Sequence, residues 1–197
     1  MKNGVLIQDL RVPAFSLSKI NGKYLGVSSF YAEPLLTVKD PECERLHSEA
    51  TKKMFSNGDC TYLEFISNLD LLYRYVIKCK ELNIAIRLLY IESDYSYEVC
   101  DYDFSNKEFL GYEYCEIPFD SQVITDLDWY EPFHKYYSLL NEYGLFNTLK
   151  DVEIFKIAYD DAFQKGHIGD GEMDTYICKV YSIDTEQFIQ DYENKAC

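Results

Sequence analysis

The sequence lacks the short motifs that identify common catalytic and nucleotide-binding sites. It has no Gly-x-Ser-x-Gly elbow, and no glycine-rich phosphate loop opens a helix. Its three histidines, His47, His134 and His167, stand far apart and form no H-x-x-x-H or H-E-x-x-H pattern. A metal site needs several convergent ligands, so we expect these histidines at the surface or at helix ends. We therefore expect no metal, no cofactor and no enzymatic activity.

Long apolar segments are also missing. No run approaches the ~18 apolar residues of a membrane-spanning helix, and Asp9 interrupts the region where a signal peptide would need its apolar core. The cysteines are seven in number and widely spaced, with no C-x-x-C pair to begin a zinc site. We expect a cytoplasmic protein without membrane contact, with thiols that are mostly reduced and buried. A disulfide or a catalytic thiol is the alternative.

What the sequence contains is enough apolar and aromatic material for a folded core. Of the 197 residues, 47% are hydrophobic and 16% aromatic, whereas a disordered chain would be poor in both. No linker, low-complexity tract or internal repeat divides the chain. Because helices and strands mix without strict βαβ alternation, we expect residues 1–197 to form one α+β domain.

Apolar patterns and turn signals place the expected strands. They predict strands at residues 5–12, 23–31, 84–91, 95–104, 109–117 and 175–183. The first ends at Pro13 and is expected at a sheet edge. The run 84–91 is apolar on both faces apart from Arg87, which favours a central strand covered on two sides. The simplest arrangement is a mostly antiparallel sheet whose centre is a meander over residues 84–117, packed by several helices.

Apolar residues at helical spacing, together with caps, place the helices. We expect one helix over residues 40–55 with Pro41 in its first turn, and a longer one from a capping box at Thr61 to about Leu82. Pro132 is expected to begin a helix that Gly144 closes. Thr148 is expected to cap a helix that ends at Gly166, and Asp184 to cap a short C-terminal helix.

Charge is distributed unevenly along the chain. The formal net charge is −15, and residues 1–89 hold twelve Lys or Arg and ten Asp or Glu. Residues 90–197 hold seven Lys or Arg and twenty-four Asp or Glu. An acidic half repels nucleic-acid phosphates and anionic lipid, so direct binding to either is disfavoured. A basic protein is the favoured partner, although acidity that serves only solubility explains the same numbers.

One segment, residues 90–120, combines nine carboxylates and six tyrosines with a single lysine. Tyrosine is rigid and amphipathic and is enriched at recognition surfaces, and carboxylates around it can accept hydrogen bonds from Arg and attract Lys. We therefore predict an acidic, tyrosine-rich surface that binds a basic partner. Its expected residues are Glu92, Asp94, Tyr95, Tyr97, Glu98, Asp101, Tyr102, Asp103, Glu108, Tyr112 and Glu113. The alternative is that the rings belong to the core and the acids form a solvated face or deter edge-to-edge aggregation.

Carboxylates also leave an enzymatic alternative open. Asp170, Glu172 and Asp174 alternate as oxygen ligands do, although the order of an EF-hand loop is absent. An unrecognised carboxylate pair or metal site is therefore the second hypothesis, and a regulatory or scaffold module is the third.

The segments "LLNEYGLFNTLKDVEIFKIAYDDAFQKG" (139–166) and "DTYICKVYSI" (174–183) resemble small bacterial immunity proteins. Such proteins are encoded beside polymorphic or contact-dependent growth inhibition toxins. The likeness rests on a Gly-Leu-Phe corner, a Thr-capped helix, a glycine and a closing strand, over less than a third of the chain. It implies a toxin inhibitor acting in bacterial competition, which blocks a cognate toxin, often a basic nuclease, by occupying its active site or substrate groove.

Overall fold

The structure is a computed structural model. The described residues are 2–10, 35, 38–55, 68–93, 104, 106–116, 120–121, 127, 129–169 and 175–196. They fall into two compact units. The first holds the described residues up to Phe109 and those from Tyr181 onward, and the second holds those from Leu110 to Val180. The expected single domain remains a prediction.

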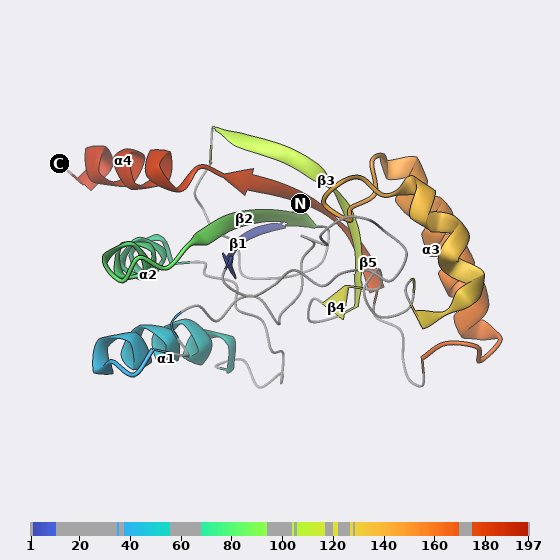
Figure 1. The fold of residues 1–197 in the computed structure, drawn as a ribbon, viewed down its shortest axis with the longest axis horizontal. Coiled ribbons are helices and arrows are strands. Elements are labelled where there is room, and N and C mark those ends of the chain that lie inside the picture. Colours follow the sequence, from blue (N-terminus) through green and yellow to red (C-terminus); the bar gives the residue numbers. More distant parts are fainter. Residues whose placement is uncertain are drawn as a thin grey trace. The chain divides into compact units, whose positions relative to one another are not determined.

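The strands form one five-stranded sheet in an α+β fold, as the sequence predicts (Figure 1). The strands are β1 (Lys2–Asp9), β2 (Ile86–Ser93), β3 (Lys107–Glu116), β4 (Asp120–Ser121) and β5 (Thr175–Ile183). Their order is β1-β2-β5-β3-β4, and the pairs β1–β2 and β3–β4 are antiparallel. The expected meander over residues 84–117 is wrong, because the last strand, β5, lies between β2 and β3. The expected strands at 23–31 and 95–104 fall outside the described residues, apart from Phe104.

The pairing of β1 with β2 confirms two expectations about these strands. Among the described strands, β1 lies at the edge of the sheet, and its register places Val5 opposite Tyr90 and Gln8 opposite Arg87. Both faces of β2 are covered, since the consecutive residues Leu88, Leu89, Tyr90 and Ile91 are all at most 2% exposed. Successive side chains point to opposite faces of a strand, so a continuous buried run marks a strand covered on two sides.

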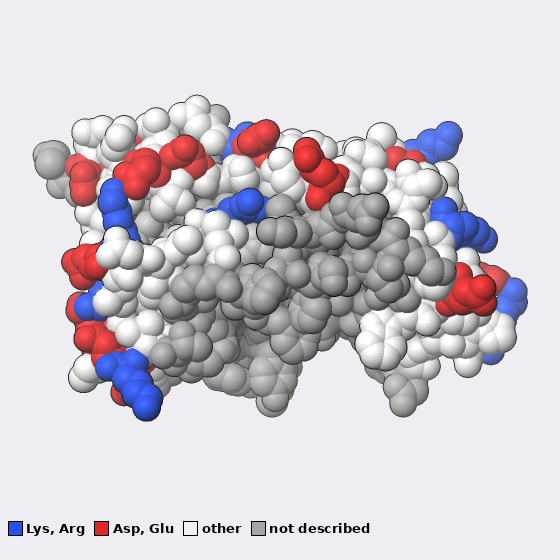
Figure 2. All heavy atoms as spheres, viewed as in Figure 1, with Lys and Arg blue, Asp and Glu red and all other residues white. Residues whose placement is uncertain are grey.

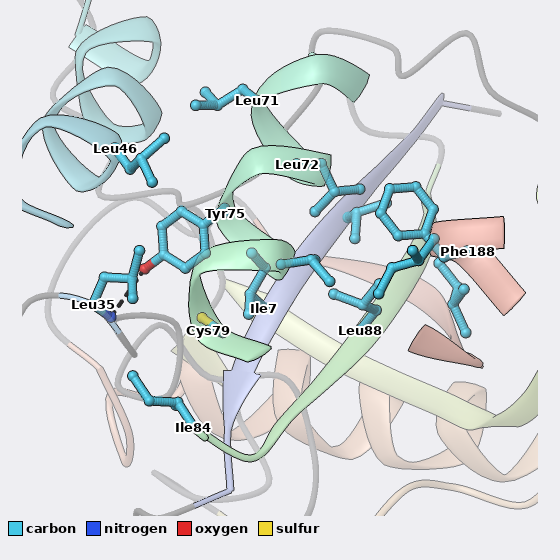
Figure 3. Close-up of a cluster of buried hydrophobic side chains, with 14 of the residues drawn as sticks. Ile7, Leu35, Leu46, Leu71, Leu72, Tyr75, Cys79, Ile84, Leu88 and Phe188 are labelled. Carbon is cyan, nitrogen blue, oxygen red and sulfur yellow. Dashed lines mark hydrogen bonds between the residues drawn. The ribbon is translucent and has the colours of Figure 1, made fainter. Parts of the chain in front are cut away.

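Three helices belong to the first unit: α1 (Pro41–Phe55), α2 (Leu69–Glu81) and α4 (Thr185–Ala196). Helix α2 contacts both α1 and α4. Its residues Leu72, Tyr75 and Cys79 are buried in the core of this unit, and the Tyr75 hydroxyl accepts a hydrogen bond from the backbone N–H of Leu35 at 3.2 Å (Figure 3). Apolar residues at i, i+3 and i+7 of one helix share a face, which explains why α2 can fill this core.

The second unit packs two helices around an aromatic core. These are the 3₁₀-helix η3 (Glu131–Leu139) and α3 (Leu149–Gln164). The fully buried Phe155 ring of α3 contacts the rings of Phe133 and Tyr136 from η3 and of Tyr114 from β3. The sequence predicted a helix from Pro132, and the structure has a 3₁₀-helix there that ends at Leu139, five residues before Gly144.

Local caps determine where the helices begin and end. Thr148 and Asp151 form a reciprocal capping box at the start of α3, and Asp184 accepts a hydrogen bond from the backbone N–H of Gln187 at the start of α4. Both caps were expected. Helix α2 differs from its prediction, because it begins at Leu69 with Asn68 as the cap, and Thr61 is therefore not its N-terminal residue.

Candidate functional site

Of the eleven residues predicted to form an acidic, tyrosine-rich surface, the structure describes four. Asp94, Tyr95, Tyr97, Glu98, Asp101, Tyr102 and Asp103 lie outside the described residues, so their part of the prediction stays a prediction. The other four, Glu92, Glu108, Tyr112 and Glu113, belong to β2 and β3. The structure gives each of them a different environment.

Glu92 is engaged in a compact charged and aromatic cluster of the first unit. Its carboxylate lies 2.9 Å from the Lys107 ammonium and accepts a hydrogen bond from the Tyr181 hydroxyl at 3.0 Å. The ammonium in turn lies 4.2 Å from the centre of the Tyr90 ring and 5.0 Å from that of Tyr181. Side chains of Glu92 and Lys107 are only 16% and 22% exposed. A cation held by two rings and a carboxylate stabilises the fold, so Glu92 is not available to a partner.

The burial of Glu113 contradicts the predicted acidic surface more directly. It is fully buried, so it cannot belong to an exposed acidic face. Tyr112 is half-buried against the aromatic core of the second unit, and its backbone pairs with that of Phe146. Of the four described residues of the predicted surface, Glu108 is exposed and has no ion pair within the described part of the chain, and it lines a pocket.

Several tyrosines that the structure describes are core residues. Tyr75, Tyr90, Tyr114 and Tyr159 are each at most 3% exposed. The hydroxyl of Tyr114 lies 2.6 Å from that of Thr175 and donates to the Asp160 carboxylate at 3.1 Å. A buried hydroxyl needs such partners to compensate for lost water. For these rings, the alternative interpretation from the sequence, a core role, is correct.

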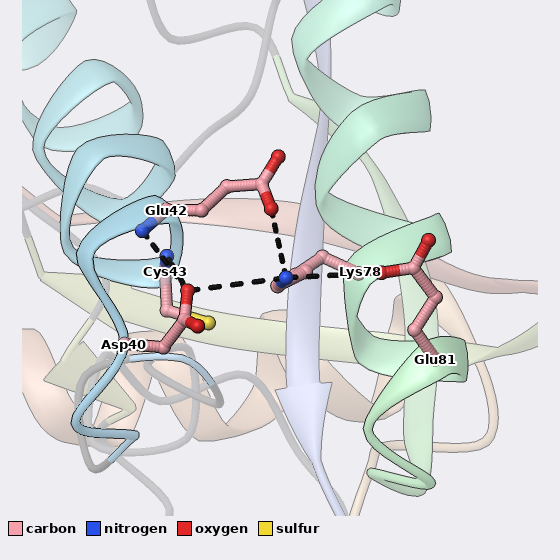
Figure 4. Close-up of polar contacts among 5 residues, drawn as sticks. All are labelled: Asp40, Glu42, Cys43, Lys78 and Glu81. Atoms are coloured by element: carbon pink, nitrogen blue, oxygen red, sulfur yellow. Dashed lines mark hydrogen bonds and ion pairs between the residues drawn. The ribbon is translucent and has the colours of Figure 1, made fainter.

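Many acidic side chains of the first unit serve helix packing. Lys78 of α2 lies 2.8 Å from Glu42, 3.7 Å from Glu81 and 3.8 Å from Asp40, so three carboxylates converge on one ammonium (Figure 4). Asp40 also accepts hydrogen bonds from the backbone N–H groups of Glu42 and Cys43, which caps α1. This cluster joins the N-terminus of α1 to the side of α2.

These contacts shift the pKa values of three groups in the cluster, in directions that fit a structural role. The hydrogen bond from the Cys43 N–H, with a smaller effect of Lys78, lowers the pKa of Asp40. Burial, and then the hydrogen bond with Asp40, raises the pKa of the Cys43 thiol, so this cysteine is kept as an unreactive thiol. The hydrogen bond with Glu42 raises the pKa of Lys78. The shifts of Asp40 and Lys78 favour their charged, paired forms in the folded protein.

Helices α2 and α4 are joined by a second set of polar contacts. The Tyr73 and Tyr192 rings stack at 4.1 Å, and their hydroxyls donate to Glu193 and Asp70. Each of these hydrogen bonds raises the pKa of its tyrosine. Figure 2 shows that carboxylates over α1, α2 and α4 alternate with Lys and Arg side chains. This part of the surface is therefore a mixed, internally paired face.

Large exposed aliphatic side chains lie on the outer face of α3 in the second unit. Ile157 is 70% exposed in the middle of the helix, with Ile154 and Leu149 at 40% and 45%. Glu153 precedes Ile157 by one turn, is exposed, and has no ion pair among the described residues. Asp161 follows by one turn and pairs with Lys165 at 2.7 Å. We call Leu149, Glu153, Ile154, Ile157 and Asp161 the α3 outer face.

The sequence reasoning missed this face, although a signal was present. The apolar spacing in this helix predicts a core stripe of Leu149, Val152, Phe155, Ala158, Tyr159, Ala162 and Phe163. Of these, Val152, Phe155, Tyr159 and Ala162 are buried. Ile154 and Ile157 do not belong to that stripe, and large aliphatic side chains on the opposite side of an amphipathic helix are the available clue. Leu149 was assigned to the stripe, but it is exposed.

Within the described part of the chain, no group of three or more His, Cys, Asp or Glu side chains is placed to hold a metal ion. Asp170, Glu172 and Asp174 fall outside that part. None of the helices described is both long and apolar enough to cross a membrane. Comparison with protein-family models, curated proteins and solved structures gave no match to this chain.

Proposed function

We propose that the protein is a non-catalytic binding protein that neutralises a basic protein partner by direct contact. The observation that carries the proposal is the α3 outer face, where Ile157 is 70% exposed at mid-helix beside two further exposed aliphatic side chains. Contiguous exposed apolar side chains rimmed by charge are typical of interaction sites. In the specific form that the resemblance implies, the partner is a nuclease-type toxin and the protein acts as its immunity protein.

Charge selects the kind of partner. The chain carries a net charge of −15, and the exposed, unpaired Glu153 lies beside the aliphatic side chains. A negative field accelerates encounter with a basic surface and disfavours acidic proteins, whereas buried aliphatic anchors slow dissociation. A nuclease needs a positive groove for its phosphate substrate, so it offers the surface that fits this protein. Blocking that groove requires binding alone.

The first experiment identifies the partner and then tests the face. The tagged protein is isolated from its native cell, and a protein that copurifies at one-to-one stoichiometry is identified and purified. We expect this partner to be basic, and Ile157→Ser to weaken its binding by roughly tenfold. Leu82→Ser is the matched control, because Leu82 is 38% exposed on the first unit. A partner that is acidic, or that binds Ile157→Ser as tightly as the wild type, would contradict the proposal.

A second experiment distinguishes the surface predicted from the sequence from the α3 outer face. Reversing Asp101 and Asp103 to Lys tests the surface predicted from the sequence, whereas Glu153→Lys tests the α3 outer face. Association rates are measured at several salt concentrations, because steering by charge is screened by salt. We expect Glu153→Lys to slow association and reduce its salt dependence. An unchanged rate for Glu153→Lys with a slower one for the Asp101 and Asp103 variant would move the contact to residues 90–120.

A further inference from the structure

A pocket of about 290 Å³ opens in the first unit, at the sheet edge where β1 ends and β2 begins. The start of β3, the end of β5 and the first residue of α4 complete its wall. The lining residues are Leu10, Ile86, Arg87, Asn106, Glu108, Ser182, Ile183, Asp184 and Thr185. Six of these have polar or charged side chains, so the pocket is a polar site of small-molecule size.

Arg87 is the unusual member of this wall. It is the single charged residue in the apolar run 84–91, and its Nη1 atom is buried without a hydrogen-bond partner. No carboxylate among the described residues lies within ion-pair distance of its guanidinium. Gln8, directly opposite on β1 and 4% exposed, also has an unpaired buried atom, Oε1. Buried polar groups are normally paired, so a guanidinium in the pocket wall with an unpaired Nη1 atom indicates a missing ligand.

Alternation along the strands places three polar side chains on one face of the sheet. Leu88 of β2 and Ile183 of β5 point into the core of the first unit, so their neighbours Arg87 and Ser182 point to the other face. Glu108 of β3 points to the same face as Arg87 and Ser182, because the adjacent Lys107 lies over aromatic rings on the core side. Since the strand order is β2-β5-β3, Ser182 stands between the cation and the carboxylate.

The charges of the pocket restrict its ligand. Arg87 provides one positive group, whereas the exposed Glu108 and Asp184 provide two carboxylates. A simple anion would be repelled by the carboxylates, and a simple cation by the guanidinium. A ligand with both a carboxylate and an ammonium group satisfies both sides, since Arg pairs with a carboxylate through two parallel hydrogen bonds.

We propose that this pocket binds a small zwitterion of the α-amino acid class, with its carboxylate on Arg87 and its ammonium toward Glu108 and Asp184. Ser182 and Thr185 add hydroxyl groups, and Leu10, which is 43% exposed, provides apolar surface for a side chain. The site is in the first unit, whereas the α3 outer face is in the second. The inference therefore goes beyond the proposed function and stands without it.

The test uses the full chain and a panel of the twenty L-amino acids, each at millimolar concentration. Thermal unfolding identifies any that stabilise the fold, because a ligand that binds the native state raises its apparent stability. Titration calorimetry then measures stoichiometry and affinity. We expect at least one amino acid to bind at one-to-one stoichiometry, and neither propionate nor propylamine, which each carry one of the two charges, to match its affinity.

Variants assign the binding to the pocket. We expect Arg87→Met to weaken binding of that amino acid at least about tenfold, and Glu108→Gln to weaken it by a smaller factor. Arg74→Met is the control, because Arg74 pairs with Glu49 on the helices and does not line the pocket. If Arg87→Met does not fold, the exposed Glu108→Gln carries the test. Absence of binding by any amino acid overturns the proposal. If Arg87→Met folds, equal affinity of this variant and the wild type overturns it. If Arg87→Met does not fold, equal affinity of Glu108→Gln and the wild type overturns it.

Discussion

The sulfur atoms of Cys115 and Cys178 lie 3.8 Å apart on the neighbouring strands β3 and β5, and both residues are at most 1% exposed. Cys43 and Cys79 are likewise buried. The expected burial is therefore confirmed for these four cysteines, and their reduced state stays a prediction. Cys60, Cys100 and Cys197 lie outside the described residues.

Burial predicts that these four thiols are protected from reagents in the native protein. A thiol reacts as the exposed thiolate, and a reagent does not reach a buried thiol. We expect Cys43, Cys79, Cys115 and Cys178 to remain unlabelled by iodoacetamide under native conditions and to be labelled in denaturant. Mass spectrometry of peptides measures the labelling at each cysteine. Rapid native labelling of Cys115 or Cys178 would contradict the packed arrangement of β3 and β5.

The cluster around Lys107 predicts that Glu92 contributes to stability and leaves partner binding unaffected. Glu92→Gln leaves the Lys107 ammonium without its ion pair while the Tyr90 and Tyr181 rings remain. We expect the free energy of unfolding to fall by about 1–3 kcal/mol, since the pair is largely buried. Denaturant unfolding measures this loss. Glu108→Gln is the control, because Glu108 is exposed and unpaired on the same strand as Lys107. Equal stability of both variants would show that the cluster contributes nothing.

The lowered pKa of Asp40 predicts a loss of stability in acid. Below its ordinary pKa of 3.8, the unfolded chain takes up a proton that the folded, hydrogen-bonded carboxylate resists. The contribution of Asp40 is therefore complete above that pH and disappears as the pH falls through the lowered folded-state value. We expect Asp40→Asn to be less stable than wild type at pH 7 and to lose less stability between pH 5 and pH 2.

Urea unfolding at a series of pH values measures this difference. Glu44→Gln is the matched control, because it removes one carboxylate from the same first turn of α1 and has no ion pair in the described structure. We expect its stability to follow the wild-type pH dependence. Parallel curves for wild type and Asp40→Asn would mean that the cap at α1 does not depend on the charge of Asp40.

A side chain at position 111 is expected to clash with the segment before α3, because Gly111 of β3 lies close to it. Gly111 has a φ of +152°, and a Cβ atom there would lie 2.7 Å from the Leu145 Cβ and 3.0 Å from the Phe146 carbonyl oxygen. We expect Gly111→Ala to cost about 1–3 kcal/mol from overpacking in addition to backbone strain. Gly166→Ala, where φ is +69° and no atom lies within 4 Å, isolates the backbone strain and should cost only about 1–2 kcal/mol. Thermal unfolding compares the two, and equal losses would exclude the predicted contact.

The local part of the fold could be predicted because it depends on residues close together in the chain. Thr148 with Asp151, Pro41 in the first turn of α1, and Asp184 before α4 act within one helical turn. β5 has the predicted bounds, Thr175–Ile183. Thr61 shows the limit of this reasoning, because Asn68 caps α2 instead.

The sequence by itself determined the negative charge, the α+β character and the positions of most described helices and strands. Only the tertiary structure decided that β5 lies between β2 and β3, that Glu113 is buried, and that Glu92 pairs with Lys107 while Ile157 is exposed. Alternation along a strand or helix divides side chains between two faces but does not say which face another part of the chain covers. That choice depends on contacts between residues far apart in sequence, such as Tyr181 with Glu92.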